Sequence, residues 1–295
     1  MMLAMLIILF FLFMVLGMPI AFTMGASAAF TFMYAGIDPM VMAQRTFTST
    51  NSFALMAIPL FMLAGNLMER VGITEELIDF CDKCVGHIRG GLAQTTCLTG
   101  ILMAAMCGSN NASASAIGSM MIPGLRKEGY DDGFSCSLIA ASGNLGPIIP
   151  PSIIMIIYAS ATNMPINRLF MSGMVPGILM GIGFMVYCNL HAKRIGMVPK
   201  KRAKAKEVWK AFTKAFFALM TPVIILVGIM SGAFTATESG AIAVLYSALY
   251  GLARRRLSLK DMVESLYQAA ISTLGPMVVI CFAAAFSYLL TYCDF

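Results

Sequence analysis

Cys107-Gly-Ser-Asn-Asn-Ala-Ser-Ala-Ser-Ala-Ile-Gly118 is a polar, small-residue stretch that interrupts one of the most apolar regions of the chain. A second interruption, Gly143-Asn-Leu-Gly-Pro-Ile-Ile-Pro-Pro-Ser152, follows it closely and is rich in helix-breaking residues. Lipid tolerates irregular backbone only where protein or a water-filled cavity satisfies its free N–H and C=O groups. Two such interruptions close together in a membrane chain therefore indicate an ion or solute site.

The surrounding composition is that of a membrane protein. Of the 295 residues, 59% are hydrophobic and only 12% are charged, with a mean hydropathy of +0.83. A soluble domain carries about 25% charged residues, so the composition predicts an all-α polytopic membrane protein. The net charge of +6 does not indicate nucleic-acid binding, because the basic residues cluster beside apolar segments as the positive-inside rule describes.

The first interruption predicts a re-entrant helical hairpin. It divides the segment 92–125 into an apolar piece of about 16 residues and a returning piece of about ten, and neither comfortably crosses a hydrocarbon core of roughly 30 Å at about 1.5 Å per residue. A hairpin that enters and leaves on one side fits better than two spans. The segment 133–161 is then a discontinuous transmembrane helix, broken at Gly146-Pro-Ile-Ile-Pro-Pro151.

The rest of the chain alternates apolar runs with polar links. Two apolar segments, 3–16 and 20–36, precede a polar link at 37–52. This pattern divides the chain into the apolar segments of 1–68, a surface helix in 69–91, the two interruptions in 92–161, further apolar segments with basic cytoplasmic loops in 162–270, and a last apolar run in 271–295.

Two basic loops orient the chain. The segment 191–214 and the run Arg254–Lys260 carry most of the basic residues, which places both in the cytoplasm. Counting crossings back from these loops puts the N-terminus on the opposite, periplasmic side. Within the first loop, the spacing of Trp209, Phe212 and Phe216 predicts an interfacial helix.

Proline supplies the chemistry of the second interruption. Because it has no N–H, each proline in a helix frees the carbonyl four residues earlier. Pro147, Pro150 and Pro151 would thereby free the carbonyls of Gly143, Gly146 and Pro147. Freed carbonyls in a low-dielectric site are ligands for a hard cation such as Na⁺, and half-helix N-termini favour anionic substrate groups.

Neutral oxygens supply the chemistry of the first interruption. Ser109, Asn110 and Asn111 lie at the expected hairpin tip, while Ser113 and Ser115 are candidate caps for the returning helix. Neither interruption contains Asp, Glu, Lys or Arg, which argues against a proton relay and favours Na⁺. The alternative is purely structural, with small residues for packing and prolines as kinks.

Other candidate sites carry weaker signals. Cys81 and Cys84 form a single C-x-x-C without a second pair, a weak metal or redox signal. Glu238 is a functional candidate if buried, but a short non-cytoplasmic turn explains it better. A serine protease would need a base near the tip serines, and His87 and His191 lie in surface segments. No nucleotide-binding loop appears in the sequence, so an ATP-driven pump is not indicated.

Many short motifs match one family in order. They are Ile58-Pro-Leu-Phe61, Gly86-His-Ile-Arg-Gly-Gly-Leu-Ala93, the Gly-Ser-Asn tip with Ala116-Ile-Gly-Ser119, Ile122-Pro123, Lys127-Glu-Gly-Tyr130, Gly146-Pro-Ile-Ile-Pro-Pro-Ser152, Thr221-Pro-Val-Ile-Ile225 and Phe234-Thr-Ala-Thr-Glu238. Over nearly its whole length the chain resembles the DctM-like large membrane subunit of tripartite ATP-independent periplasmic (TRAP) transporters.

The resemblance implies a permease rather than an enzyme. It implies Na⁺-driven uptake of small organic acids, such as C4-dicarboxylates or sialic acid, across the bacterial inner membrane, with no ATPase and no cofactor besides Na⁺ as coupling ion. The implied partners are a periplasmic solute-binding protein, a small four-helix membrane subunit and the lipid bilayer. The implied mechanism is of the elevator type, in which hairpins and broken helices carry the solute. In that scheme 1–68 and 162–270 supply scaffold helices, 92–161 is half of the transport domain, and 271–295 starts a second repeat.

The resemblance places one Na⁺ site, by motif position, at Cys107, Asn110 and Gly146 with the neighbouring carbonyl of Pro147. With the oxygens noted above, the hypothetical Na⁺ ligands are Cys107, Ser109, Asn110, Gly143, Gly146 and Pro147, and the hypothetical substrate-lining residues are Asn111, Ser113, Pro150, Pro151 and Ser152.

Three departures from the family pattern bear on this assignment. Cys107 stands where the family commonly has Ser, and Ala236 replaces a usual Pro. Family members also run well past 295 residues with a second hairpin and broken helix, so we expect a C-terminally truncated or split subunit that holds half of a site. The rival interpretation is an unrelated channel or transporter scaffold with one re-entrant loop, which would act without a binding protein.

Overall fold

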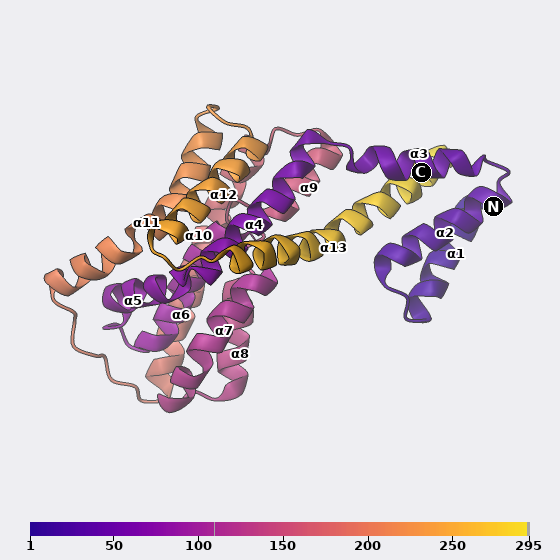
Figure 1. Cartoon of the computed structure of the whole chain (residues 1–295). Coiled ribbons are helices and arrows are strands. Elements are labelled where there is room, and N and C mark those ends of the chain that lie inside the picture. The colour runs from indigo at the N-terminus through magenta and orange to yellow at the C-terminus, as the bar shows by residue number, and fades with distance from the viewer. Residues whose placement is uncertain (109, 294–295) are drawn as a thin grey trace. The chain divides into compact units, whose positions relative to one another are not determined.

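The computed structural model describes residues 1–108 and 110–293, and within them the side chains of all residues but Ala104, Cys107, Asn111 and Ala112. Over this described part the chain is helical and contains no β-strand, which confirms the all-α class (Figure 1). The helices divide into two compact units, Met1–Leu55 with Ala270–Phe295, and Met56–Ala269.

The smaller unit is built from three N-terminal helices and the later part of the last one. These are α1 (Met2–Val15), α2 (Ile20–Tyr34), α3 (Pro39–Thr50) and the C-terminal portion of α13 (Leu259–Tyr292). Its core joins Leu6, Ala28 and Phe32 to Ala285 and Leu289. Close packing is possible because Gly25 has no Cβ, which would lie 2.5 Å from the ring of Phe282.

The segment 37–52, expected only as a polar link, is largely the helix α3. The carboxylate of Asp38 accepts a hydrogen bond from the N–H of Met40 at 2.8 Å, and Pro39 occupies the first helical position. Both are helix-start signals, so the polar composition here marks an exposed helix rather than an irregular loop.

The larger unit contains the two interruptions. Its elements are α4 (Ala57–Arg70, preceded by the 3₁₀ turn Phe53–Met56), α5 (Ile73–Val85), α6 (Gly91–Cys107), α7 (Asn110–Lys127), α8 (Asp132–Gly143), α9 (Ile153–Thr162), α10 (Ile166–Arg194), α11 (Ala205–Met230), α12 (Ala236–Ala253) and the start of α13. The helices α6, α7 and α8 pack on one another, as Figure 1 shows. The hairpin and the first half of the broken helix therefore form one packed group.

Four described helical segments are long and apolar enough to cross a membrane. They are Phe53–Arg70, Ile166–Arg194, Ala205–Met230 and Leu259–Tyr292. Their exposed apolar residues, such as Val175, Leu179 and Val186 on α10, have no reason to face water and are expected to face lipid. The chain is a multi-pass membrane protein.

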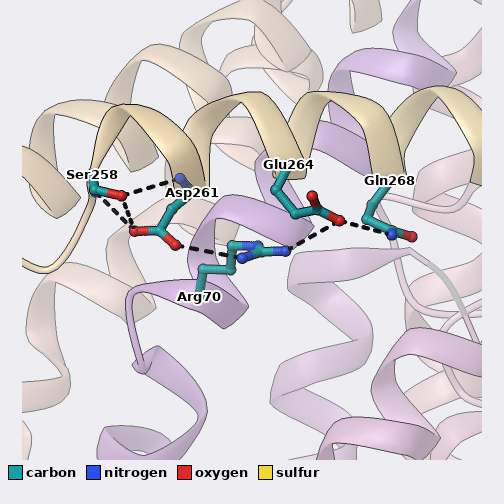
Figure 2. Close-up of polar contacts among 5 residues, drawn as sticks. All are labelled: Arg70, Ser258, Asp261, Glu264 and Gln268. Atoms are coloured by element: carbon teal, nitrogen blue, oxygen red, sulfur yellow. Dashed lines mark hydrogen bonds and ion pairs between the residues drawn. The ribbon is translucent and has the colours of Figure 1, made fainter.

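The charged segment after α4 differs from the expected single surface helix over 69–91. The helix α4 continues to Arg70, and α5 begins at Ile73 after a turn at Gly72 with φ +79°. The side chain of Arg70 reaches the start of α13, where its guanidinium lies 3.5 Å from Asp261 and 3.9 Å from Glu264 (Figure 2). These two ion pairs of Arg70 thus connect α4 to α13.

The aromatic segment of the first basic loop also differs from expectation. The sequence predicted an interfacial helix there, separate from the following span. In the structure, α11 begins at Ala205 and continues without interruption to Met230. Trp209 and Phe212 therefore lie on the first turns of a helix of membrane-spanning length.

Candidate functional site

The hairpin tip meets the broken helix. Asn110, the first residue of α7, donates a hydrogen bond from Nδ2 to Oδ1 of Asn144 at 3.1 Å. Gly108 in the tip has φ +59°, and a Cβ there would lie 2.6 Å from the carbonyl oxygen of Pro151. The tip therefore contacts both ends of the interruption, Asn144 at its start and Pro151 at its end.

Glycine keeps the approach close. A Cβ on Gly143 would lie 2.9 Å from Oδ1 of Asn110 and 2.9 Å from Cβ of Ala114. Both distances are shorter than side chains tolerate, so only glycine permits α7 to approach α8 at this point. The Gly143 position that the sequence assigned to the Na⁺ site is thus next to an amide oxygen of Asn110.

The broken helix partly satisfies its own freed carbonyls. The carbonyl of Gly143 accepts a hydrogen bond from the N–H of Gly146 at 3.0 Å. The carbonyl of Pro147 accepts one from the hydroxyl of Ser152 at 2.6 Å, and that hydroxyl accepts in turn from the N–H of Met155 at 3.3 Å, capping α9. Two of the three predicted ligands therefore already have one protein partner.

The carbonyl of Gly146 is different. No backbone N–H of residues 1–108 or 110–293 and no side chain that the structure describes donates to it, and Pro150, four residues later, has no N–H to offer. Gly146 itself is buried. A buried carbonyl without a donor needs water or a cation, which makes Gly146 the strongest ligand candidate of the three.

Ser113 is not a helix cap. The helix α7 begins at Asn110, so Ser113 lies in its interior, and Ser115 is exposed. The hydroxyl of Ser113 is fully buried and has no hydrogen-bond partner among the described groups. The capping expectation is therefore wrong, and a buried donor is left free for another ligand.

The remaining predicted site residues form two groups: those that are buried and those that the structure does not describe. Pro150, Pro151 and Ser152 are buried in the interruption. Ser109 lies outside the described residues, as do the side chains of Cys107 and Asn111.

The long helix α10 supports the site with a stripe of glycines. Gly173, Gly177 and Gly181 recur every four residues, which places them on one face of the helix. A Cβ at Gly173 would lie 2.5 Å from the carbonyl oxygen of Ile148, and one at Gly181 would lie 2.5 Å from the side chain of Ile101. The stripe thus lets α10 pack closely against both the interruption and α6.

Sequence reasoning missed Asn144 and this glycine stripe. Asn144 belongs to the second interruption, but only the glycines, the prolines and Ser152 of that stretch were assigned. The four-residue spacing of Gly173, Gly177 and Gly181 is a small-residue pattern that the sequence itself contains. Neither signal says by itself which partner the residue meets.

Two other candidates have structural explanations. Oε2 of Glu238 accepts hydrogen bonds from the N–H and the hydroxyl of Thr235, both at 2.8 Å, in a capping box that starts α12. This agrees with the turn interpretation. Of the C-x-x-C pair, Cys81 is fully buried and Cys84 is half-buried, and burial raises the pKa of the Cys81 thiol to about 12, which disfavours the reactive thiolate.

A helical hairpin packed against a discontinuous helix, in a multi-pass membrane protein, is the kind of site that secondary transporters build near the bilayer midplane. The chain belongs to the DctM component family of tripartite ATP-independent periplasmic transporters, whose model matches residues 7–295.

Three similar proteins are TRAP transporter permeases. The chain is 39% identical over 273 residues to the C4-dicarboxylate TRAP transporter large permease protein DctM of Pseudomonas aeruginosa, covering 91% of this chain and 64% of that one. It is 36% identical to the sialic acid TRAP transporter large permease protein SiaM of Vibrio cholerae, covering 87% of this chain and 61% of that one. It is 37% identical to the isethionate TRAP transporter permease protein DctMQ of Oleidesulfovibrio alaskensis, covering 96% of this chain and 45% of that one. The chain therefore spans less than two thirds of the length of these relatives, all of which are permeases rather than enzymes.

Proposed function

We propose that the chain is the permease subunit of a Na⁺-coupled secondary transporter that imports small organic acids. The observation that carries this proposal is the contact between Asn110 on the hairpin tip and Asn144 in the broken helix. It brings neutral oxygens of two interrupted helices together without a charged residue in either stretch. Family membership supplies the context for this arrangement.

The Na⁺ ion would be held at the hairpin tip. Its expected ligands are the amide oxygen of Asn110 and the carbonyls of Gly146 and Pro147. Gly146 is buried and its carbonyl has no donor in the described part of the chain, and Pro147 retains a second lone pair beside its bond to Ser152. Neutral oxygens of this kind suit a hard cation that must be released again. Cys107, Ser109 and Gly143 complete the proposed ligand set.

The solute would lie beside this ion. Its carboxylate is expected near the N-terminal ends of α7 and α9, because helix N-termini favour anions. Ser113 offers a buried hydroxyl that has no partner among the residues the structure describes, and Asn111, Pro150, Pro151 and Ser152 complete the proposed wall. Organic acids are favoured as a class because the named relatives are permeases for C4-dicarboxylates, sialic acid and isethionate.

The transport movement proposed is of the elevator type. The packed group α6, α7 and α8 would move with α9 as a body relative to scaffold helices, carrying ion and solute together. The proposed partners are a periplasmic binding protein that delivers the solute and a small four-helix membrane subunit. The proposed location is the bacterial inner membrane with a periplasmic N-terminus, because the basic loops fit the cytoplasmic side.

Na⁺ binding to the purified chain tests the first step. The unfolding midpoint should rise in NaCl relative to choline chloride at equal ionic strength, because a ligand of the folded state stabilises it. Asn110→Ala and Gly146→Val should reduce this rise. The matched controls are Asn189→Ala, at an exposed site on α10, and Gly183→Val, where a side chain meets nothing within 4 Å. An unchanged Na⁺ effect in correctly folded Asn110→Ala and Gly146→Val would refute the site.

Uptake by reconstituted protein tests the whole function. Proteoliposomes containing the permease, the small subunit and the binding protein should accumulate an organic acid only with an inward Na⁺ gradient. Asn110→Ala should raise the Na⁺ concentration for half-maximal uptake. Conduction of solute without the binding protein would instead favour the channel interpretation.

A further inference from the structure

A groove of about 590 Å³ lies between α5 and the start of α11, and none of its lining residues belongs to the hairpin tip. Aromatic rings form much of its wall: Phe80 and Phe212 lie 5.8 Å apart between ring centroids, and Trp209 and Phe212 lie 5.7 Å apart. Trp209 is 66% exposed. A tryptophan with this exposure at the start of a membrane-length helix is typical of the membrane–water interface.

The groove is also basic. Arg202 lines it directly, and its lining residues include no carboxylate. The chain around it adds further exposed basic residues, which are Lys201, Lys204, Lys206 and Lys210. Of the basic residues in 200–210, all of which the structure describes, Lys200 is the one with an ion pair, to Glu128. The carboxylate of Glu207 instead caps α11, accepting from the N–H of Lys204 at 3.0 Å.

The acidic residues of α5 do not line the groove. Asp82 on α5 pairs with Lys83 at 3.4 Å. Glu75 and Asp79 belong to a different pocket, which Lys214 also lines. Within the described part of the chain, the basic residues Lys201, Arg202, Lys204, Lys206 and Lys210 beside Trp209 form no ion pair.

We propose that this groove binds an anionic phospholipid of the cytoplasmic leaflet. The guanidinium of Arg202 would bind the headgroup phosphate, for which its planar donor fork is suited. An acyl chain would lie along Trp209, Phe212 and Phe80. Charge complementarity identifies the occupant, because basic side chains beside a membrane surface attract anionic headgroups. The aromatic wall favours a ligand that also has a hydrocarbon chain.

The chain contains a built-in probe for this groove, because Trp209 is its single tryptophan. Brominated acyl chains quench tryptophan fluorescence on contact. The full chain would be reconstituted in vesicles of mixed phosphatidylglycerol and phosphatidylcholine, with bromine on one lipid or the other at equal mole fractions. Brominated phosphatidylglycerol should quench Trp209 several-fold more effectively than brominated phosphatidylcholine.

Variants separate a specific site from general charge. Arg202→Gln should lower the preference for phosphatidylglycerol roughly fivefold, the equivalent of about 1 kcal/mol for one basic residue at an anionic surface. Lys200→Gln removes the same charge from the same segment, but Lys200 pairs with Glu128 and does not line the groove. This control should retain most of the preference.

Each result decides the proposal. Equal quenching by the two brominated lipids would overturn the proposal. That result is also the one expected if a protein partner covers Trp209 in place of lipid. Equal losses in Arg202→Gln and Lys200→Gln would also overturn it, because they would show a diffuse electrostatic effect. Soluble glycerol phosphate added at the same headgroup concentration should not displace the brominated lipid. Displacement would show that the site takes a free phosphate compound.

Discussion

Asn110 and Asn144 join the two interrupted helical segments by a side-chain hydrogen bond of 3.1 Å, although they stand 34 residues apart in the chain. The bond uses the amide N–H of Asn110 and the amide oxygen of Asn144. It leaves the amide oxygen of Asn110 directed toward the gap kept open by Gly143. One asparagine thus fixes the tip against the broken helix and still offers an oxygen to a ligand.

Asn144→Ala should therefore weaken Na⁺ binding without removing a proposed ligand. Loss of the hydrogen bond costs about 1 kcal/mol in tip positioning, which corresponds to a roughly fivefold weaker apparent affinity. The measurement is the Na⁺ concentration that gives half of the thermal stabilisation of the purified chain. Asn144→Asp, which keeps an acceptor for Asn110, should recover part of the loss. Identical Na⁺ titrations for Asn144→Ala and the unmodified chain would contradict a positioning role.

Gly108→Ala tests the contact between the tip and the other end of the interruption. Gly108 has φ +59°, and a Cβ there would lie 2.6 Å from the carbonyl oxygen of Pro151. Gly129→Ala is the matched control, since Gly129 has φ +89° but nothing within 4 Å of the added atom. Both variants should lose about 1 kcal/mol of stability from backbone strain.

Only Gly108→Ala should also displace the tip. We expect a lower unfolding midpoint for it than for Gly129→Ala, together with loss of the Na⁺-dependent rise. Equal midpoints and equal Na⁺ responses in the two variants would show that the contact with Pro151 is unimportant.

Composition alone marks both interruptions that meet at Asn110 and Asn144. Prolines and glycines marked the broken helix, because the loss of N–H groups and of Cβ atoms is a property of the residues themselves. The pairing of Asn110 with Asn144 could not be predicted, because it depends on how α7 is rotated against α8. The bond from Ser152 to Pro147 was likewise invisible, since a freed carbonyl looks the same in sequence whether or not a hydroxyl later reaches it.

Charge patterns were less reliable guides to element boundaries. Within the first basic loop, the spacing of Trp209, Phe212 and Phe216 predicted an interfacial helix, and the helix α11 that contains them runs unbroken to Met230. Between Ala205 and Met230 the helix is not ended by any residue, and even Pro222 lies inside it. A change from polar to apolar composition marks where a helix meets lipid, but it does not end the helix.

Two arginines of the larger unit should contribute unequally to stability. Arg256 contacts Glu76 at 3.2 Å and the carbonyl of Val71 at 3.1 Å. The side chain of Glu76 is only 10% exposed and also accepts a hydrogen bond from Tyr250 at 2.9 Å. Removing Arg256 would leave a largely buried carboxylate with one fewer donor, which costs about 1–3 kcal/mol.

Arg70 provides the comparison. Its contacts with Asp261 and Glu264 are 3.5 Å and 3.9 Å long, and all three side chains are at least 35% exposed (Figure 2). Exposed pairs of this kind contribute about 0–1 kcal/mol. Arg256→Gln should therefore lower the unfolding midpoint in detergent clearly more than Arg70→Gln. A larger effect for Arg70→Gln would show that the α4–α13 cluster is the stronger tie.

Asp132 gives the loop between α7 and α8 a defined pH dependence. Its two carboxylate oxygens accept hydrogen bonds from Nε and Nη2 of Arg126 at 2.5 Å and 2.9 Å. The guanidinium holds the pKa of Asp132 below its ordinary value. A carboxyl whose pKa is lower in the folded state stabilises that state above its unfolded pKa of about 3.9. That contribution is lost as the pH falls through the folded pKa, so it is constant at neutral pH and disappears in acid.

Asp132→Asn should therefore lower the unfolding midpoint slightly at pH 7, because both partners are well exposed and screened by water. The difference between Asp132→Asn and the unmodified chain should shrink as the pH is lowered below about 4, where the wild-type carboxyl also becomes neutral. Arg126→Gln should reproduce the neutral-pH loss, since it removes the other half of the same pair. Paired thermal melts of the three proteins at pH 7 and at the lowest pH the detergent complex tolerates provide the measurement. A difference that stays constant down to that pH would mean that Asp132 stabilises the loop through its shape and not through its charge.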